Sequence, residues 1–300
     1  MRAVVITALA GAFALAACRP DRPAGPGPLP PPMLAHVQDL DGTPDLIVDA
    51  KRLADSWVVY DQTFDAGVCS VIEGGVLAGE HRVLRFTVTT PNIGDADVFV
   101  GDPLAHMDPN GDGDFSDQDG LFEFASCHNH FHFRHYATYE LVSPGTGHVW
   151  KSAKRGFCML DITPWQTDGG VSSWVYRSCG TKTLHGFQGI SVGYADTYNK
   201  HLGGQYFVLD GGDNQAPILP GLYIIRITVN PPFVAARGEA CPHVDPHGFC
   251  HQLLESNYDN NVGEVLIMIP DHPGKQGFGP GSNDISNADL IDDENRPDKP

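Results

Sequence analysis

Basic residues are scarce in this 300-residue sequence, which has 19 lysines and arginines against 37 aspartates and glutamates. The formal net charge of −18 argues against nucleic acid as a partner, because proteins bind a phosphate backbone chiefly through lysine and arginine. The same excess of negative charge attracts cationic partners over long range. Solubility and bound cations explain the charge equally well, so both interpretations stay open.

The N-terminal apolar run, residues 4–17, is too short to span a bilayer. It follows Arg2 and carries no charge, so it predicts a signal peptide over residues 1–17. Its end, Leu15-Ala16-Ala17-Cys18, resembles the cleavage box of bacterial lipoproteins and predicts a lipidated Cys18. Ordinary signal cleavage near the same place is the alternative.

The residues after Cys18 bear on where such a lipoprotein would reside. Arg19 stands where an aspartate would indicate retention in the inner membrane. Residues 18–36 are rich in proline and glycine, which predicts a tether. We therefore expect an exported lipoprotein of the bacterial cell envelope, in the outer membrane and facing the periplasm or the surface. The lipid would be its only contact with the membrane.

Long segments with a helical period are missing, and no internal repeat is evident. Short alternating segments separated by Gly, Pro and Asp turns predict an all-β protein, a β-sandwich core with long loops and little helix. The expected domain covers residues 37–270, and the polar, acidic residues 271–300 are expected to form a disordered tail. The expected strands lie within residues 44–50, 80–90, 136–142, 205–209, 221–230 and 262–269.

Three histidines, His128, His130 and His132, stand at alternate positions after Cys127. In an extended segment their rings point to one face, which favours a site for zinc, copper, iron or nickel. The outer two backbones would lie about 13 Å apart in a flat strand, too far for one ion. We therefore expect a bend, bulge or strand end near His130. The alternative is a polar strand with solvated histidines.

Seven cysteines are present, and six remain when Cys18 is set aside. An even number in an exported chain indicates disulfides, and spacing alone allows fifteen pairings. The six are Cys69, Cys127, Cys158, Cys179, Cys241 and Cys250.

The segment 108–119 has the spacing of a twelve-residue calcium loop, with Gly113 at the sharp turn. Its last position is aspartate rather than the usual glutamate, and its flanks do not look helical. An acidic solvated turn is the alternative to a calcium site. The candidate ligands are Asp108, Asn110, Asp112, Asp114 and Asp119.

From about residue 44 to residue 269 the chain resembles lysyl oxidase, a copper amine oxidase that makes its own lysine tyrosylquinone cofactor. The family carries copper on WxWxxCHxHxH, its cofactor lysine in KASFCLED, and its cofactor tyrosine at the end of QG[LI]SPGxxDxY. The matching segments here read FEFASCHNHFH (122–132), KRGFCMLD (154–161) and QGISVGYADTY (188–198). Two later segments, GLY (221–223) with VNP (229–231) and ESNYDNN (255–261), resemble family motifs in the same order.

This resemblance implies copper(II) on the three histidines and a cofactor made from Lys154 and Tyr198. It also implies the disulfides Cys69–Cys127 and Cys158–Cys179. Cys241 and Cys250 lie in an insertion that the family lacks, so they are expected to pair with each other. A structural calcium site is implied as well, with Asp45, the Leu46 carbonyl, Glu255, Asn257, Asn260 and Asn261 as ligands.

Two departures from the family pattern stand out. Phe122 and Phe124 replace both tryptophans of the copper segment. The family histidine that is sometimes proposed as the catalytic base falls near Thr138, and His135 is offset from it. The departures leave every expected copper ligand and both cofactor precursors in place, but they leave the base unassigned.

The activity implied is oxidation of peptidyl-lysine or another primary amine to an aldehyde, with release of hydrogen peroxide and ammonia. Lysine-bearing cationic proteins and small primary amines are the expected substrates. Two other functions fit three histidines: a non-enzymatic metal-binding surface module, and a zinc hydrolase with a general base beside the metal. Only the amine oxidase requires contact between Lys154 and Tyr198.

Overall fold

The computed structural model describes residues 42–285, apart from residue 155 and residues 166–174, 213 and 236–240. The expected signal peptide, Cys18 and the tether lie outside the described residues. No helix in the described part of the chain is long and apolar enough to cross a membrane.

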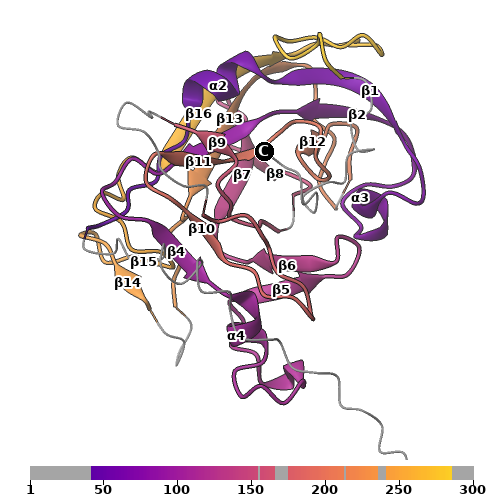
Figure 1. The fold of residues 1–300 in the computed structure, drawn as a ribbon. Coiled ribbons are helices and arrows are strands. Elements are labelled where there is room, and N and C mark those ends of the chain that lie inside the picture. The colour runs from indigo at the N-terminus through magenta and orange to yellow at the C-terminus, as the bar shows by residue number, and fades with distance from the viewer. Residues whose placement is uncertain (1–41, 155, 166–174, 213, 236–240, 286–300) are drawn as a thin grey trace, which may run out of the picture.

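The all-β prediction is confirmed, because short strands in small antiparallel sheets make up most of the regular structure. The described helices are α2 (Ala50–Asp55), α3 (Cys69–Ile72), α4 (Pro103–Met107) and the 3₁₀ turn η1 (Phe115–Asp117). Each of them is shorter than two full α-helical turns, so the packing of strands rather than helices organises the core (Figure 1).

The largest sheet has the strand order β16-β13-β7-β8. Its strands are β7 (Ala137–Val142), β8 (Val149–Lys151), β13 (Gly221–Val229) and β16 (Val262–Ile269). Tyr223, Ile225, Ile227 and Val229 of β13 are all buried, as their alternation in the sequence predicted. Fully burying a side chain of this size contributes about 1.5–3 kcal/mol.

Two three-stranded sheets pack over the buried face. One is β1 (Val58–Phe64), β2 (Gly79–Arg85) and β12 (Tyr206–Val208), and the other is β3 (Val88–Pro91), β11 (Tyr194–Tyr198) and β9 (Thr163–Pro164). Phe86 joins the layers, because its ring stacks on Phe207 at 5.1 Å and meets the edge of Tyr139 at 5.5 Å. β11 carries Tyr198, whose ring lies 6.1 Å from that of Tyr136 and 5.3 Å from that of Phe157 in the same core.

Smaller elements complete the fold on the side of α4 (Figure 1). The hairpin β5 (Phe122–Ala125) and β6 (His130–Phe133) carries the histidines, and β4 (Val98–Gly101) pairs with β10 (Gln188–Ile190). In the insertion, β14 (His243–Val244) pairs with β15 (Cys250–His251), and the expected Cys241–Cys250 disulfide is present.

Two strand predictions need correction. Residues 44–50 form no full strand, although Leu46 bridges Asn92 and backbone hydrogen bonds join residues 45–49 to residues 89–93. Ala50 already starts α2, because the Asp49 side chain caps the Arg52 N–H. The predicted strand 80–90 is divided into β2 and β3, because its two halves pair with different partners.

The prediction of disorder after residue 270 is wrong for residues 271–285. Phe278 and Val59 exchange two backbone hydrogen bonds of 2.8 Å each, and the Gly281 N–H donates to the Trp57 carbonyl. The Phe278 ring also packs 6.0 Å from the Trp57 ring. Backbone pairing and one aromatic side chain thus order a segment whose composition alone suggests disorder. Residues 286–300 lie outside the described residues.

Candidate metal and cofactor site

The turn between β5 and β6 brings the three histidines together. His130 is the first residue of β6, which confirms the strand end expected there, and His128 lies in the preceding turn. Asn129, between them, has a left-handed φ of 55°, a conformation that asparagine tolerates better than most residues. The chain therefore bends between His128 and His130, while His130 and His132 keep to one face of the strand.

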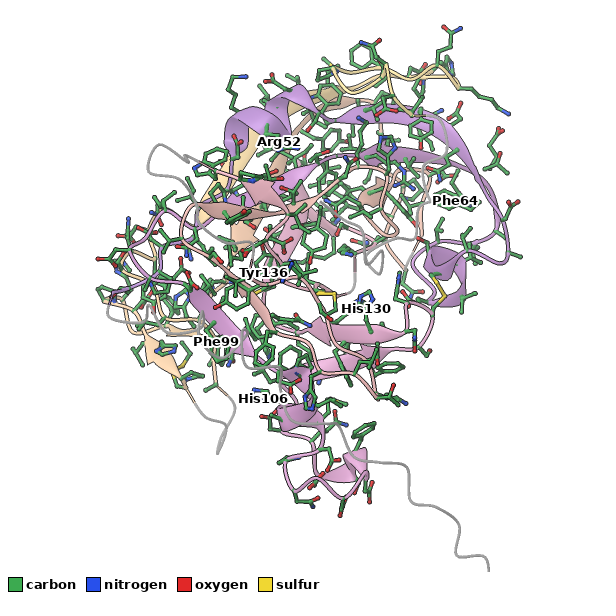
Figure 2. All side chains as sticks on the ribbon, viewed as in Figure 1. Arg52, Phe64, Phe99, His106, His130 and Tyr136 are labelled. Carbon is green, nitrogen blue, oxygen red and sulfur yellow. A yellow bond between two sulfur atoms is a disulfide. The ribbon has the colours of Figure 1, made fainter. Side chains whose placement is uncertain are left out.

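The spacing of the three rings suits a single ion. The His128 ring centroid lies 5.5 Å from that of His130 and 5.5 Å from that of His132, and the last two are 4.8 Å apart. Imidazole nitrogens lie about 2.0 Å from bound zinc, so ring centroids around one ion should be roughly 5 Å apart. The nitrogens His128 Nδ1, His130 Nε2 and His132 Nε2 are buried, and Figure 2 shows His130 inside the fold.

The three rings are spaced for a single metal ion, but their donor atoms are not yet arranged around one. In the described part of the chain, no group of three His, Cys, Asp or Glu side chains has its donor atoms already set for a metal ion. Backbone and turn fix the ring spacing, whereas an imidazole can rotate about its side-chain bonds as metal binds. The residues fit an imidazole-preferring ion such as copper(II) or zinc.

A glycine accommodates the ring of His132. A Cβ on Gly156 would lie 2.0 Å from His132 Nδ1 and 2.8 Å from His132 Cβ, so no larger residue fits without moving the ring. The Phe133 N–H donates to the Phe157 carbonyl at 2.6 Å, which holds this segment against β6. Gly156 stands where the family motif has serine. This difference is the only feature of the sequence that indicates that Gly156 makes room for the His132 ring.

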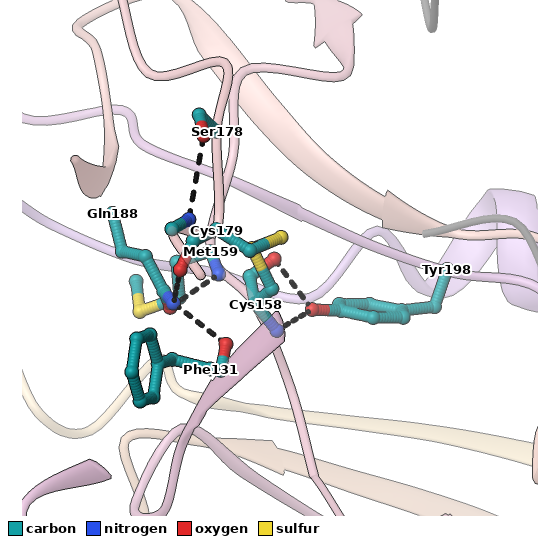
Figure 3. Close-up of a disulfide and its surroundings, with 8 residues drawn as sticks. Phe131, Cys158, Met159, Ser178, Cys179, Gln188 and Tyr198 are labelled. Atoms are coloured by element: carbon teal, nitrogen blue, oxygen red, sulfur yellow. Dashed lines mark hydrogen bonds between the residues drawn. A yellow bond between two sulfur atoms is a disulfide. The ribbon is translucent and has the colours of Figure 1, made fainter. Parts of the chain in front are cut away.

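Lys154 and Tyr198 meet in the structure. Lys154 Nζ lies 4.7 Å from the centroid of the Tyr198 ring, although the two residues come from separate segments. The Tyr198 hydroxyl donates to the Cys158 carbonyl and accepts from the Cys158 N–H, both at 2.7 Å (Figure 3). Two backbone partners therefore fix the hydroxyl end of a ring that is only 3% exposed.

A small cleft is lined by two of the histidines and by Lys154, but not by Tyr198 or His130. His128, His132 and Lys154 all contribute to its wall, and Tyr198 lies beneath Lys154. His130 is buried behind its two neighbours and does not line the cleft. The remaining lining residues are Ser70, Glu73, Gly75, Ala153, Gly156, Gly203 and Gly204.

Disulfides hold both sides of the cleft, and the pairs Cys69–Cys127 and Cys158–Cys179 are those that the resemblance implied. Next to the second, Gln188 donates to the carbonyls of Phe131 and Cys179 and accepts from the Met159 N–H (Figure 3). Gln188 thus ties the histidine strand to the segment that follows Lys154. In the sequence, Gln188 was identified only as a residue that matches the family motif.

The structure keeps both candidate positions for the base away from the cleft. The His135 ring packs against Phe233 at 5.7 Å, and Thr138 pairs with Thr228 inside the main sheet. Neither residue lines the cleft. By contrast, Glu73, which sequence reasoning missed, does line it.

Four of the five expected calcium-binding side chains, those of Asp45, Glu255, Asn260 and Asn261, gather where the first and last parts of the domain meet. Asp45 Oδ1 accepts from Asn260 Nδ2 at 2.9 Å, and Glu255 accepts from the Leu46 N–H and from Asn261 Nδ2. The amide oxygens of Asn260 and Asn261 are buried and accept no hydrogen bond, so they are available to a hard cation. Asn257 is exposed, and its side chain accepts from the Asp259 N–H.

Burial of Glu255 gives this site a pH dependence. Desolvation raises the pKa of its carboxyl to about 8 from an ordinary 4.5, although hydrogen bonds from Asn230, Leu46 and Asn261 oppose the rise. Between these two values the calcium-free folded protein keeps a proton that the unfolded chain releases. The contribution of Glu255 to the stability of the calcium-free protein is therefore full below about pH 4.5 and is lost as pH rises toward 8.

We predict that calcium removes most of this pH dependence, because the cation binds the ionised carboxylate. In a chelator, the free energy of unfolding should fall by about 3–4 kcal/mol between pH 5 and pH 8. Urea unfolding at several pH values, with and without calcium, measures how the free energy of unfolding depends on pH in each condition. Glu255→Gln is the control. Its free energy of unfolding should show neither this fall with pH nor a change of the pH dependence when calcium is added. Equal slopes with and without calcium in the wild type would exclude a structural calcium at Glu255.

In the second expected calcium loop, many of the side-chain oxygens are engaged by the loop itself. Asp108 accepts from the N–H groups of Asp112 and Gly113, and Asp114 accepts from the Ser116 N–H. Asp119 faces His106 Nδ1 at 2.6 Å. The expectation of non-helical flanks needs a correction, because α4 ends at Met107, immediately before the loop, although β5 rather than a helix follows it. Calcium binding here stays a prediction.

The structure thus places three clustered histidines near a lysine that lies over a tyrosine ring. The family model for lysyl oxidase matches residues 45–240, so the chain belongs to the lysyl oxidase family. Human lysyl oxidase homolog 1 is 29% identical over 226 residues, which are 74% of this chain and 32% of that protein. Pig protein-lysine 6-oxidase is 25% identical, and the match covers 77% of this chain and 78% of that protein.

This chain thus spans about a third of the length of the human homologue. Among solved structures, the CARDB domain of a Pyrococcus furiosus protein, solved with di-metal ions, has a TM-score of 0.25 and 11% identity. That match covers 76% of this chain and 90% of the CARDB chain, and it is too weak to support any argument.

Proposed function

We propose that this protein is a copper-dependent amine oxidase that makes a lysine tyrosylquinone from Lys154 and Tyr198. The observation that carries the proposal is the 4.7 Å separation between Lys154 Nζ and the Tyr198 ring, in the cleft that His128 and His132 line. Neither a binding module nor a zinc hydrolase requires this contact. The relatives named protein-lysine 6-oxidase support the same reaction class.

The reaction would convert a primary amine, dioxygen and water to an aldehyde, ammonia and hydrogen peroxide. Copper would supply the redox chemistry that makes the Tyr198 ring reactive toward dioxygen, and the resulting quinone would accept electrons from the amine. His128, His130 and His132 would hold the copper through imidazole nitrogens.

The chain's own residues contribute mainly by positioning. The hydrogen bonds of the Tyr198 hydroxyl to Cys158 keep the ring in one orientation, and Lys154 is held over that ring. The Cys69–Cys127 disulfide joins α3 to the histidine turn, and Gln188 joins β6 to the segment that follows Lys154. Such preorganisation aligns the reacting atoms before chemistry begins.

The decisive experiment is copper loading in air followed by peptide mass analysis. We expect a covalent Lys154–Tyr198 cross-link, a carbonyl that reacts with a hydrazine and absorbs visible light, and peroxide release from a primary amine. Zinc-loaded protein is the control and should stay colourless. If the copper protein shows neither cross-link, label nor peroxide, the enzyme proposal fails and a metal-binding surface module takes its place.

We also propose that the protein acts in the bacterial envelope as a lipoprotein anchored through Cys18. Three disulfides support an oxidising compartment, because such bonds are rare in the cytosol. Mass analysis of the mature N terminus tests this proposal, which requires a lipid on Cys18.

The formal charge of −18 leads us to propose lysine-bearing cationic proteins as preferred substrates. Attraction between exposed charges is screened beyond about 10 Å at 0.1 M salt. Oxidation of a basic protein should therefore slow several-fold between 0.05 and about 0.5 M salt, while oxidation of a small amine changes less. Peroxide release measured for both substrates across that range decides the matter, and an equal salt dependence would contradict steering.

A further inference from the structure

The site contains a carboxylate that the proposed chemistry does not use. Glu73 Oε2 lies 3.3 Å from His128 Nε2, on the nitrogen opposite to the buried Nδ1. The His128 side chain is 8% exposed and that of Glu73 is 29% exposed, so the contact lies at the wall of the cleft rather than in open solvent.

The fold holds Glu73 in this place from two directions. Cys69 begins α3, Glu73 ends it with an N–H donated to the Cys69 carbonyl, and the Cys69–Cys127 disulfide attaches the helix beside His128. On the other side, the Ser70 hydroxyl accepts from the Gly204 N–H at 3.1 Å. The helix α3, which Glu73 caps, is thus attached both to the histidine turn and to the segment of Gly204.

A hydrogen bond at one imidazole nitrogen decides which nitrogen can bind a metal. A ring whose Nε2–H donates to a carboxylate presents Nδ1 as the lone-pair nitrogen, and the carboxylate also fixes the ring plane. The buried nitrogen of His128 is Nδ1, whereas those of His130 and His132 are Nε2. The carboxylate and the buried nitrogen therefore lie on opposite sides of the His128 ring.

We propose that Glu73 is a positioning residue that makes His128 a metal ligand through Nδ1. This inference rests on the metal site of the proposed function but requires neither quinone formation nor turnover. It also gives the Cys69–Cys127 disulfide a specific role, since that bond joins the two halves of the Glu73–His128 pair.

Zinc binding and nitrogen NMR test the proposal without any activity measurement. Glu73→Ala should weaken zinc and copper binding about 10- to 100-fold in a chelator competition. Glu73→Gln keeps a hydrogen-bond acceptor and should remain within about threefold of the wild type. In zinc-loaded protein with ¹⁵N-labelled histidine, His128 should show metal on Nδ1 and a proton on Nε2, and Glu73→Ala should lose that protected proton. Glu80→Ala, which removes an exposed carboxylate paired with Lys275, is the matched control and should change nothing.

Three results would overturn the proposal: metal on Nε2 of His128, unchanged affinity in Glu73→Ala, or equal losses in Glu73→Ala and Glu73→Gln. The last result would indicate that the carboxylate itself binds the metal. An active wild type with any of these results would leave the proposed function intact. A wild type that binds metal through Nδ1 but never oxidises an amine would instead support Glu73 and reject the oxidase.

Discussion

Lys154→Arg should bind copper with wild-type affinity and yet never acquire the hydrazine-reactive carbonyl. Arginine keeps the positive charge and most of the length of lysine, but its guanidinium stays protonated and cannot add to a ring. Lys154 is the side chain held 4.7 Å from the Tyr198 centroid, so no neighbour should replace it. Hydrazine labelling after copper loading measures the loss, which should be complete.

Lys151→Arg is the matched control, because Lys151 is three residues away and pairs with Glu140. It should label like the wild type. Tyr198→Phe should also abolish the label and in addition lower the free energy of unfolding by about 1–3 kcal/mol, since two hydrogen bonds to Cys158 are lost. Tyr194→Phe, on the same strand, should keep the label. Full labelling of Lys154→Arg would contradict the assignment of the cofactor lysine.

Gly156→Ala should remove copper while leaving Lys154 and Tyr198 unchanged. The added Cβ would meet His132 Nδ1 at 2.0 Å and His132 Cβ at 2.8 Å, so the ring must leave its position. Loss of an outer partner of a metal ligand typically costs 10- to 100-fold in affinity, and displacement of the ligand itself should cost about as much or more. Copper affinity by chelator competition is the measurement.

Gly145→Ala is the control for the glycine change, because a Cβ there meets no atom within 4 Å. It should bind copper like the wild type. Gly156→Ser introduces the residue of the family motif and should also weaken binding, because its Cβ meets the same ring. Wild-type copper affinity in Gly156→Ala would mean that His132 is not needed as a ligand.

Sequence reasoning succeeded where local patterns determine structure. Tyr223, Ile225, Ile227 and Val229 alternate with less buried residues because one face of their sheet is buried, and a period of two reveals that face. The bend near His130 was predictable because one ion cannot reach three side chains along a flat strand. Lys154 and Tyr198, however, were found only through family motifs, since their contact joins distant segments.

The features that escaped prediction depend on contacts between distant parts of the chain. The alternation of apolar and polar residues over 80–90 does not show that the first part pairs with β1 and the second part with β11. A disulfide positions the helix of Glu73, and the His132 ring of another segment packs against Gly156. Neither residue is therefore marked by a local sequence pattern. Residues 271–285 were expected to be disordered because composition does not reveal backbone pairing with β1.

The pairing of Phe278 with Val59 matters for anyone who shortens this protein. β1 is the outer strand of the sheet β1-β2-β12, and the C-terminal segment covers part of its free edge. An exposed strand edge invites pairing with another chain and therefore aggregation. A boundary set at residue 270, just after the resemblance to the family ends, would uncover Val59 and the Trp57 carbonyl together. Expression of the domain should therefore extend at least to residue 285.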